Sequence, residues 1–344
     1  MSRGTRILCA IWYTIPLMTR STAVVLLVFS PCFNAFQPPA TQVSSSYIDP
    51  HLNLTASSGL AAVPGARLRI DTELALIPVH VTTADGTTVT SLARDNFQIF
   101  EEGVEQKITH FSKDDAPVSV GLVFDTSGSM VTKMKKSADA AQTFFKTANT
   151  DDEFFLVEFN DRPKLTIPFT PDSASLYHRI TRLRPFGRTS LLDAIHLAMV
   201  EMKKAHNLRK AIVILSDGGD NRSRFTASEI KNEMLESDVQ LYAMGIFDLD
   251  DMHKHPIEEQ NGPQLLQELA EQTGGEMFTV NSLDELGPAS EQISRELRNQ
   301  YLLGYSPSDE SRDGKFRRVK VKLNTPERPD LRTYFRHGYY APAE

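Results

Sequence analysis

Residues 118–130, Val-Ser-Val-Gly-Leu-Val-Phe-Asp-Thr-Ser-Gly-Ser-Met, join an apolar run to a turn rich in side-chain oxygens. A short apolar run bounded by turn residues is typical of a strand buried in a parallel sheet. Asp125, Ser127 and Ser129 follow at alternate positions where this predicted strand ends. Oxygen ligands at the carboxyl end of a strand suit a hard cation such as Mg²⁺, and open α/β sheets bind ligands at this edge.

Strands and helices alternate beyond this stretch, which predicts a doubly wound α/β sheet. Apolar residues at helical spacing predict a helix over residues 130–148. Ser190-Leu-Leu-Asp193 fits a capping box that opens a helix extending to Met202. The other predicted elements are strands at 153–159, 211–215, 239–247 and 276–280, and helices at 175–183, 226–236, 263–272 and 282–299.

Two later loops supply further oxygen ligands. Thr189 stands in Phe-Gly-Arg-Thr-Ser-Leu-Leu-Asp-Ala-Ile, and Asp217 follows the apolar run at 211–215. Both loops lie beside, or at, the carboxyl ends of predicted strands, as Asp125 does. The three loops together resemble, in order and type, the metal-ion-dependent adhesion site of von Willebrand factor A domains and integrin I domains. The resemblance covers roughly residues 116–300.

This resemblance implies a Rossmann-like, mostly parallel sheet and a Mg²⁺ site, with Mn²⁺ or Ca²⁺ as alternatives. It implies that hydroxyls coordinate the ion, with two carboxylates acting directly or through water: Ser127, Ser129 and Thr189, then Asp125 and Asp217. Hydroxyl ligands leave the charge of the ion poorly neutralised, and Mg²⁺ keeps exchangeable waters. An acidic side chain of a partner protein can replace such a water. We therefore expect a protein-binding or adhesion module.

Two alternatives stay open. The chain could be a structural or assembly component of the cell envelope with an incidental metal site, or a metal-dependent hydrolase. The hydrolase lacks sequence support, because there is no phosphate-binding glycine loop and no Gly-x-Ser-x-Gly elbow, and none of the three loops contains a histidine. We expect no enzymatic activity. Asp248 to Glu259 gathers acids and two histidines, but its spacing matches neither a calcium loop nor a zinc site.

Short strands separated by glycine turns predict a small β-sandwich-like module at 66–113, and a second β-rich segment at 301–344. The two segments could form a joint sandwich. Asp313-Gly314 is a hairpin-type turn signal, and a single strand-like stretch runs over 331–340. The sequences at 92–111 and 301–323, with the central Val-Phe-Asp-Thr-Ser-Gly-Ser-Met, resemble exported bacterial von Willebrand A-related proteins common in Acidobacteria.

The remaining N-terminal residues indicate export. Arginines precede a short apolar core within residues 1–38, which reads as a signal peptide or an N-terminal anchor, and 39–65 reads as a linker. We therefore expect a periplasmic, cell-envelope or secreted protein that meets the membrane only if this segment is uncleaved. The net charge of −7 argues against a general nucleic-acid binder.

Overall fold

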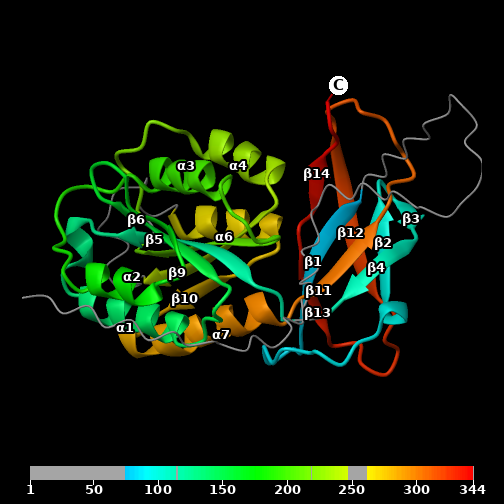
Figure 1. Cartoon of the computed structure of the whole chain (residues 1–344), viewed down its shortest axis with the longest axis horizontal. Coiled ribbons are helices and arrows are strands. Elements are labelled where there is room, and N and C mark those ends of the chain that lie inside the picture. The colour runs from blue at the N-terminus through cyan, green and yellow to red at the C-terminus, as the bar shows by residue number, and fades with distance from the viewer. Residues whose placement is uncertain (1–73, 114, 218, 247–261, 344) are drawn as a thin grey trace, which may run out of the picture. The chain divides into compact units, whose positions relative to one another are not determined.

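The computed structural model describes residues 74–113, 115–217, 219–246 and 262–343 (Figure 1). All of them belong to one compact unit, Leu68–Glu344. The predicted signal or anchor, the linker and the polar loop at 248–259 lie outside the described residues. Among the helices that the structure describes, none combines the length and the apolar character needed to cross a membrane.

A six-stranded sheet forms the centre of the α/β part, in the order β10-β9-β8-β5-β6-β7. All neighbouring strands are parallel except β6 and β7. Every residue of β5 is buried, because β5 lies inside the sheet and both faces are covered. The strands are β5 (Val118–Asp125), β6 (Glu153–Phe159), β7 (Lys164–Thr170), β8 (Arg209–Ser216), β9 (Val239–Ile246) and β10 (Met277–Val280).

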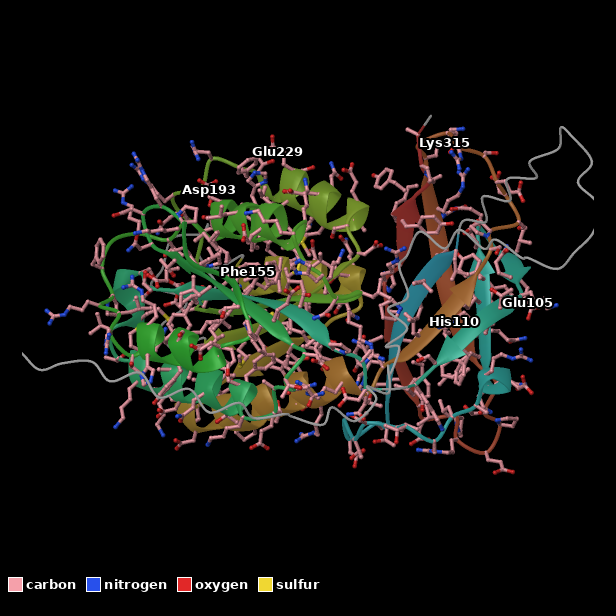
Figure 2. All side chains as sticks on the ribbon, viewed as in Figure 1. Glu105, His110, Phe155, Asp193, Glu229 and Lys315 are labelled. Atoms are coloured by element: carbon pink, nitrogen blue, oxygen red, sulfur yellow. The ribbon has the colours of Figure 1, made fainter. Side chains whose placement is uncertain are left out.

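Helices cover both faces of this sheet, and each face has its own apolar core (Figures 1 and 2). One face packs against α1 (Met134–Phe145), α2 (Ser173–Ile180) and α7 (Leu286–Arg298). The other packs against α3 (Leu191–Met202), α4 (Ala227–Glu236) and α6 (Gly262–Thr273). Alternate side chains of β5 therefore enter different cores, with Leu122 in the first and Val123 in the second. The predicted doubly wound α/β fold is confirmed.

Two local predictions in this part were wrong, and one strand was not predicted. The helix expected from residue 130 is a 3-10 turn, η2 (Gly128–Met130), followed by α1. The capping box at Ser190 does not form, because its hydroxyl donates to the carbonyl of Asn160 at 2.8 Å and caps no helical amide. Sequence analysis also missed β7, an antiparallel edge strand with no fully buried residue.

The flanking segments form two four-stranded antiparallel sheets, and each sheet takes strands from both ends of the chain. One has the order β13-β1-β11-β4 and the other β14-β12-β2-β3. Their strands are β1 (Ala75–Thr82), β2 (Phe97–Glu101), β3 (Val104–Gln106), β4 (Ile108–Ser112), β11 (Tyr301–Tyr305), β12 (Phe316–Leu323), β13 (Arg332–Phe335) and β14 (Gly338–Tyr340). The 3-10 turn η1 (Arg94–Asn96) precedes β2, and the 3-10 turn η4 (Leu283–Glu285) precedes α7 in the α/β part.

The two antiparallel sheets share one apolar core, so the flanks make a joint sandwich as the sequence suggested. Ile77 of β1 and Leu303 of β11 line this core from one sheet, and Ile99 of β2 and Val321 of β12 line it from the other. Two details differ from expectation. Residues 331–340 form two strands in different sheets, and Asp313-Gly314 joins strands of different sheets, so it makes no hairpin. The predicted division of the chain into segments otherwise stays a prediction.

Candidate functional site

The carboxyl end of β5 lies directly beside that of β8. Phe124 pairs with Leu215, so the next residues, Asp125 and Ser216, are neighbours. The Ser216 hydroxyl donates to Oδ2 of Asp125 at 2.5 Å, and the backbone amide of Ser127 donates to Oδ1 at 2.8 Å. The Asp125 side chain is completely buried and held on both oxygens. Two adjacent strands therefore fix the first candidate ligand.

The turn after β5 also holds the two candidate serines together. The hydroxyls of Ser127 and Ser129 lie 3.0 Å apart, with Ser127 buried and Ser129 exposed. The amide of Gly128 donates to the carbonyl of Gly187 at 3.1 Å, which ties this turn to the loop that carries Thr189. Gly187 has φ +79°, and an added Cβ would lie 2.6 Å from Oδ2 of Asp161. Glycine is therefore required at this position in the second loop.

The Thr189 loop is bound in turn to the loop after β8. The backbone amide of Thr189 donates to Oδ1 of Asn221 at 3.1 Å, and the amide of Asn221 donates to the Thr189 carbonyl at 3.0 Å. In addition, Asp220 accepts from the amide of Leu191 at 3.2 Å, at the start of α3. The structure thus links all three predicted loops through backbone contacts at one edge of the sheet.

The electrostatics of this edge are unusual. Burial, followed by the charge of Asp217, raises the pKa of the Asp125 carboxyl to about 7, against hydrogen bonds from Ser127 and Ser216 that lower it. Lys133 provides the nearby positive charge, since its Nζ lies 3.0 Å from Oδ2 of Asp217. Placing two carboxyl groups together away from water is unfavourable unless a cation balances them.

The donor set consists entirely of oxygens. Two carboxyl groups and three hydroxyls come from the predicted positions, namely Asp125, Asp217, Ser127, Ser129 and Thr189. Hard oxygens of this kind fit Mg²⁺, and the carboxyl pair calls for positive charge. No cluster of three or more His, Cys, Asp or Glu side chains suited to a metal ion occurs among residues 74–113, 115–217, 219–246 and 262–343.

Comparison with known proteins agrees with this architecture. The family model for the von Willebrand factor type A domain matches residues 120–219, which include β5, the serine turn, Thr189 and Asp217. The chain contains a von Willebrand factor type A domain. We refer to the six-stranded sheet with its helices as the A domain.

Curated relatives match part of the chain. Inter-alpha-trypsin inhibitor heavy chain H2 of Sus scrofa is 29% identical over 156 residues, which are 40% of this chain and 17% of the relative. An uncharacterized protein of Borreliella burgdorferi is 23% identical over 198 residues, 52% of this chain and 57% of that one. The chain thus spans only a minor part of the heavy chains that it matches.

Solved structures of low sequence identity are also similar. An aerotolerance-related membrane protein from Bacteroides fragilis is 18% identical, with a TM-score of 0.42, over 52% of this chain and 98% of that one. The von Willebrand factor domain of the type V pili tip protein Mfa5 from Porphyromonas gingivalis is 16% identical, with a TM-score of 0.44, over 53% and 95%.

Sequence reasoning missed two residues at the edge of the A domain. Ser216, which holds Asp125, immediately precedes Asp217, so the parallel register of β5 and β8 could have revealed it. No sequence pattern indicated the contact of Lys133 with Asp217, because a lysine before a helix usually faces solvent. Asp193, read as part of a capping box, instead accepts from the amides of Arg224 and Phe225 at 2.8 and 3.1 Å.

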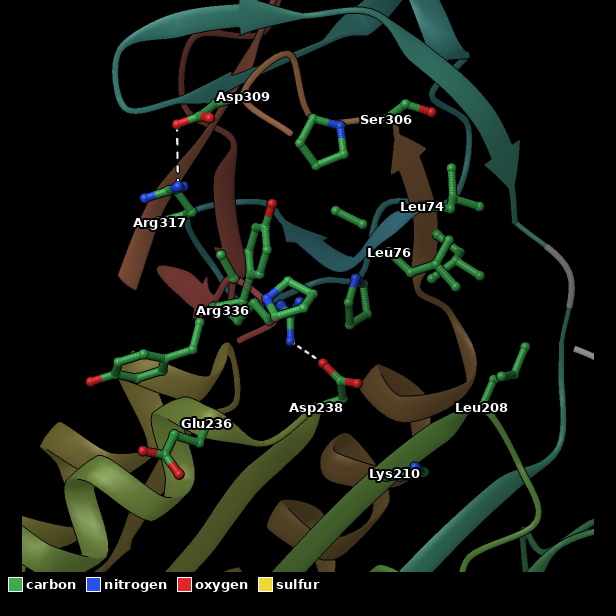
Figure 3. Close-up of a pocket in the computed structure, with 18 of the residues that line it drawn as sticks. Leu74, Leu76, Leu208, Lys210, Glu236, Asp238, Ser306, Asp309, Arg317 and Arg336 are labelled. Atoms are coloured by element: carbon green, nitrogen blue, oxygen red, sulfur yellow. Dashed lines mark hydrogen bonds and ion pairs between the residues drawn. The ribbon is translucent and has the colours of Figure 1, made fainter. Parts of the chain in front are cut away.

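A separate cleft of about 930 Å³ lies at the opposite end of the A-domain sheet, beside the sandwich (Figure 3). Lys210 near the start of β8 and Asp238 just before β9 line one side. Arg336 of the segment between β13 and β14 pairs with Asp238, and Arg317 of β12 pairs with Asp309 at 3.2 Å. Two ion pairs thus lie in the lining of this cleft, which is distinct from the carboxyl edge.

Proposed function

We propose that the A domain binds Mg²⁺ at its carboxyl edge and uses the ion to bind an acidic side chain of a partner protein. Asp125, Ser127, Ser129, Thr189 and Asp217 would hold the ion. The observation that carries this proposal is the fully buried Asp125 carboxyl close enough to Asp217 for that charge to raise its pKa. A divalent cation would relieve this repulsion.

The ligand types support binding rather than catalysis. Three of the five candidate ligands are neutral hydroxyls, so the ion would keep part of its charge and attract a further carboxylate. The exposed position of Ser129 offers access from solvent. Proteins with von Willebrand A domains generally mediate contacts between proteins, which agrees with this role. Mn²⁺ and Ca²⁺ are alternative occupants of the same oxygens.

Thermal unfolding with and without metal tests the cation site. At Mg²⁺ concentrations about 100-fold above Kd, binding to the folded state adds about 2.7 kcal/mol. This corresponds to a rise in Tm of roughly 5–10 °C for an A domain of this size. We expect Asp217→Ala to remove the rise and Ser129→Ala to reduce it. Asp284→Ala is the matched control, because Asp284 is 82% exposed and pairs with Lys136 at the surface. An unchanged Tm for the wild-type chain with Mg²⁺, Mn²⁺ and Ca²⁺ would refute the site.

The partner is tested by affinity capture from an envelope fraction, in parallel with Mg²⁺ and with chelator. We expect the wild-type chain to retain a protein only with Mg²⁺, and Ser129→Ala to retain less. Blocking carboxyl groups in the extract by amidation should abolish capture. Retention that survives chelator would instead favour the alternative of an envelope assembly component whose contacts lie elsewhere.

The alternative of an envelope assembly component is supported by the presence of the sandwich. The sandwich is built from both flanks and has a core of its own, so it presents a second folded surface in the same chain. Exposed Val104 on β3, an edge strand, is a suitable position for Val104→Glu. If this change abolishes capture while Asp217→Ala does not, the sandwich is the binding surface.

We further propose that the chain is exported to the periplasm, envelope or exterior, and that it performs no catalytic turnover. The export proposal rests on the sequence of residues 1–38, and fractionation of cells expressing the full chain tests it. Its overall charge of −7 supports a protein partner over nucleic acid.

A further inference from the structure

We infer that Lys133 is a built-in counter-ion of Asp217 that occupies part of the electrostatic role of a divalent cation and thereby lowers the affinity of the site for one. This inference rests on the proposed cation site. It assigns to a residue outside the predicted ligand set the role of setting the cation affinity.

Lys133 connects three segments of the A domain. It stands between η2 and α1, in the segment that continues from the serine turn. Its Nζ donates to Oδ2 of Asp217 at 3.0 Å and to the carbonyl of Ile246 at 3.2 Å. Asp217 follows β8, and Ile246 is the last residue of β9. Two acceptors from neighbouring strands therefore fix the ammonium group at the carboxyl edge.

This pair differs from an ordinary surface ion pair. The side chains of Lys133 and Asp217 are only 18% and 12% exposed, whereas Lys136 and Asp284 form a comparable pair with 47% and 82% exposure. Solvent screens the second pair almost completely, and such pairs contribute little. The first pair lies where water is largely excluded, so its charge acts on its neighbours more strongly.

The charge balance of the edge gives the expected direction. With Lys133 present, the ammonium already offsets one of the two carboxyl groups, Asp125 and Asp217. A divalent cation arriving there would meet a smaller negative charge and a repelling ammonium group. Without the lysine charge, the cation would meet two uncompensated carboxyl groups. Removing the charge at Lys133 should therefore strengthen divalent-cation binding and weaken the metal-free fold.

The experiment is calorimetric titration of the full-length chain with Mg²⁺, alongside thermal unfolding without metal. We expect Lys133→Met to lower the Kd for Mg²⁺ about tenfold, as one partly screened charge would. Its metal-free Tm should be below that of the wild type, with the difference reduced at saturating Mg²⁺. Lys133→Arg keeps the charge and should retain the wild-type Kd. Lys136→Met, the same substitution at the solvent-exposed pair, should change neither quantity.

If Lys133→Met fails to fold, Lys133→Gln provides a second uncharged variant with a polar side chain. An equal or weaker affinity in the uncharged variants would overturn the inference while leaving the cation site standing, because Lys133 would then only position Asp217. If neither the wild type nor the uncharged variants bind Mg²⁺, the proposed site itself is wrong and the inference falls with it.

Discussion

Gly121 of β5 offers a quantitative test of how tightly the A-domain sheet is packed beneath the proposed cation site. An alanine Cβ at this position would lie 2.2 Å from Cζ of Phe155 and 2.7 Å from both Cε atoms. Phe155 on β6 is fully buried, and its ring packs edge-on against Phe169 with centroids 4.8 Å apart. The ring therefore has to move into a filled core. Overpacking of this kind costs about 1–3 kcal/mol.

We expect Gly121→Ala to lower the free energy of unfolding by at least 1–3 kcal/mol, roughly the cost of overpacking a core. Equilibrium unfolding in urea measures this quantity. Gly287→Ala is the control, because Gly287 is in the first turn of α7 and its Cβ would have nothing within 4 Å. The control should be stabilised by about 0.5–1 kcal/mol, since alanine is the better helix former.

A double-mutant cycle with Phe155→Leu isolates the steric cause. Leucine removes the ring atoms that the new methyl group would meet, so the two substitutions together should cost at least about 1 kcal/mol less than their sum. If the two effects add to within about 0.5 kcal/mol, the clash between residues 121 and 155 does not account for the loss and the reasoning is wrong.

Three further outcomes follow from contacts near the site and the sandwich. Asn221→Ala should weaken Mg²⁺ binding severalfold by releasing the amide of Thr189, with isothermal calorimetry as the measurement. Asp193→Ala should lower the free energy of unfolding by about 1–3 kcal/mol, measured in urea, because two partly buried amide hydrogen bonds to a carboxylate are lost. Burial, then the charge of Glu276, raises the pKa of Glu296 from 4.5 to about 8. Between these values the carboxyl is protonated in the folded chain and ionised in the unfolded chain, so stability falls as pH rises from 4.5 to about 8. Glu296→Gln should therefore flatten the fall in Tm between pH 5 and pH 9, and an identical slope would contradict this assignment.

The central part of the fold could be predicted because its signals are local. All eight residues of β5 are buried, and the sequence indicates this through a mostly apolar run over residues 118–124. β7 could not be found in the same way. It lies at the sheet edge, contains Pro168 and buries no residue fully, so neither an apolar run nor strict alternation marks it.

The residues of the candidate site likewise divide into those that the sequence predicted and those that it did not. The oxygen-bearing residues at strand ends were visible in the sequence, since each follows an apolar run or begins a helix. Their partners were not, because the contact from Ser216 to Asp125 depends on the register of two strands, and that from Lys133 to Asp217 joins residues 84 positions apart. Loop-to-loop contacts such as Asn221 with Thr189 also arise only after the sheet has formed.

The A domain is inserted between β4 and β11, two strands of the sandwich that pair with each other. β4 ends at Ser112 just before the A domain begins, β11 starts at Tyr301 just after α7, and Ser112 pairs with Leu302. The chain thus leaves and re-enters the sandwich on hydrogen-bonded neighbouring strands. Because β4 and β11 are adjacent antiparallel strands, a short hairpin connection can replace the entire insertion without breaking a strand pair.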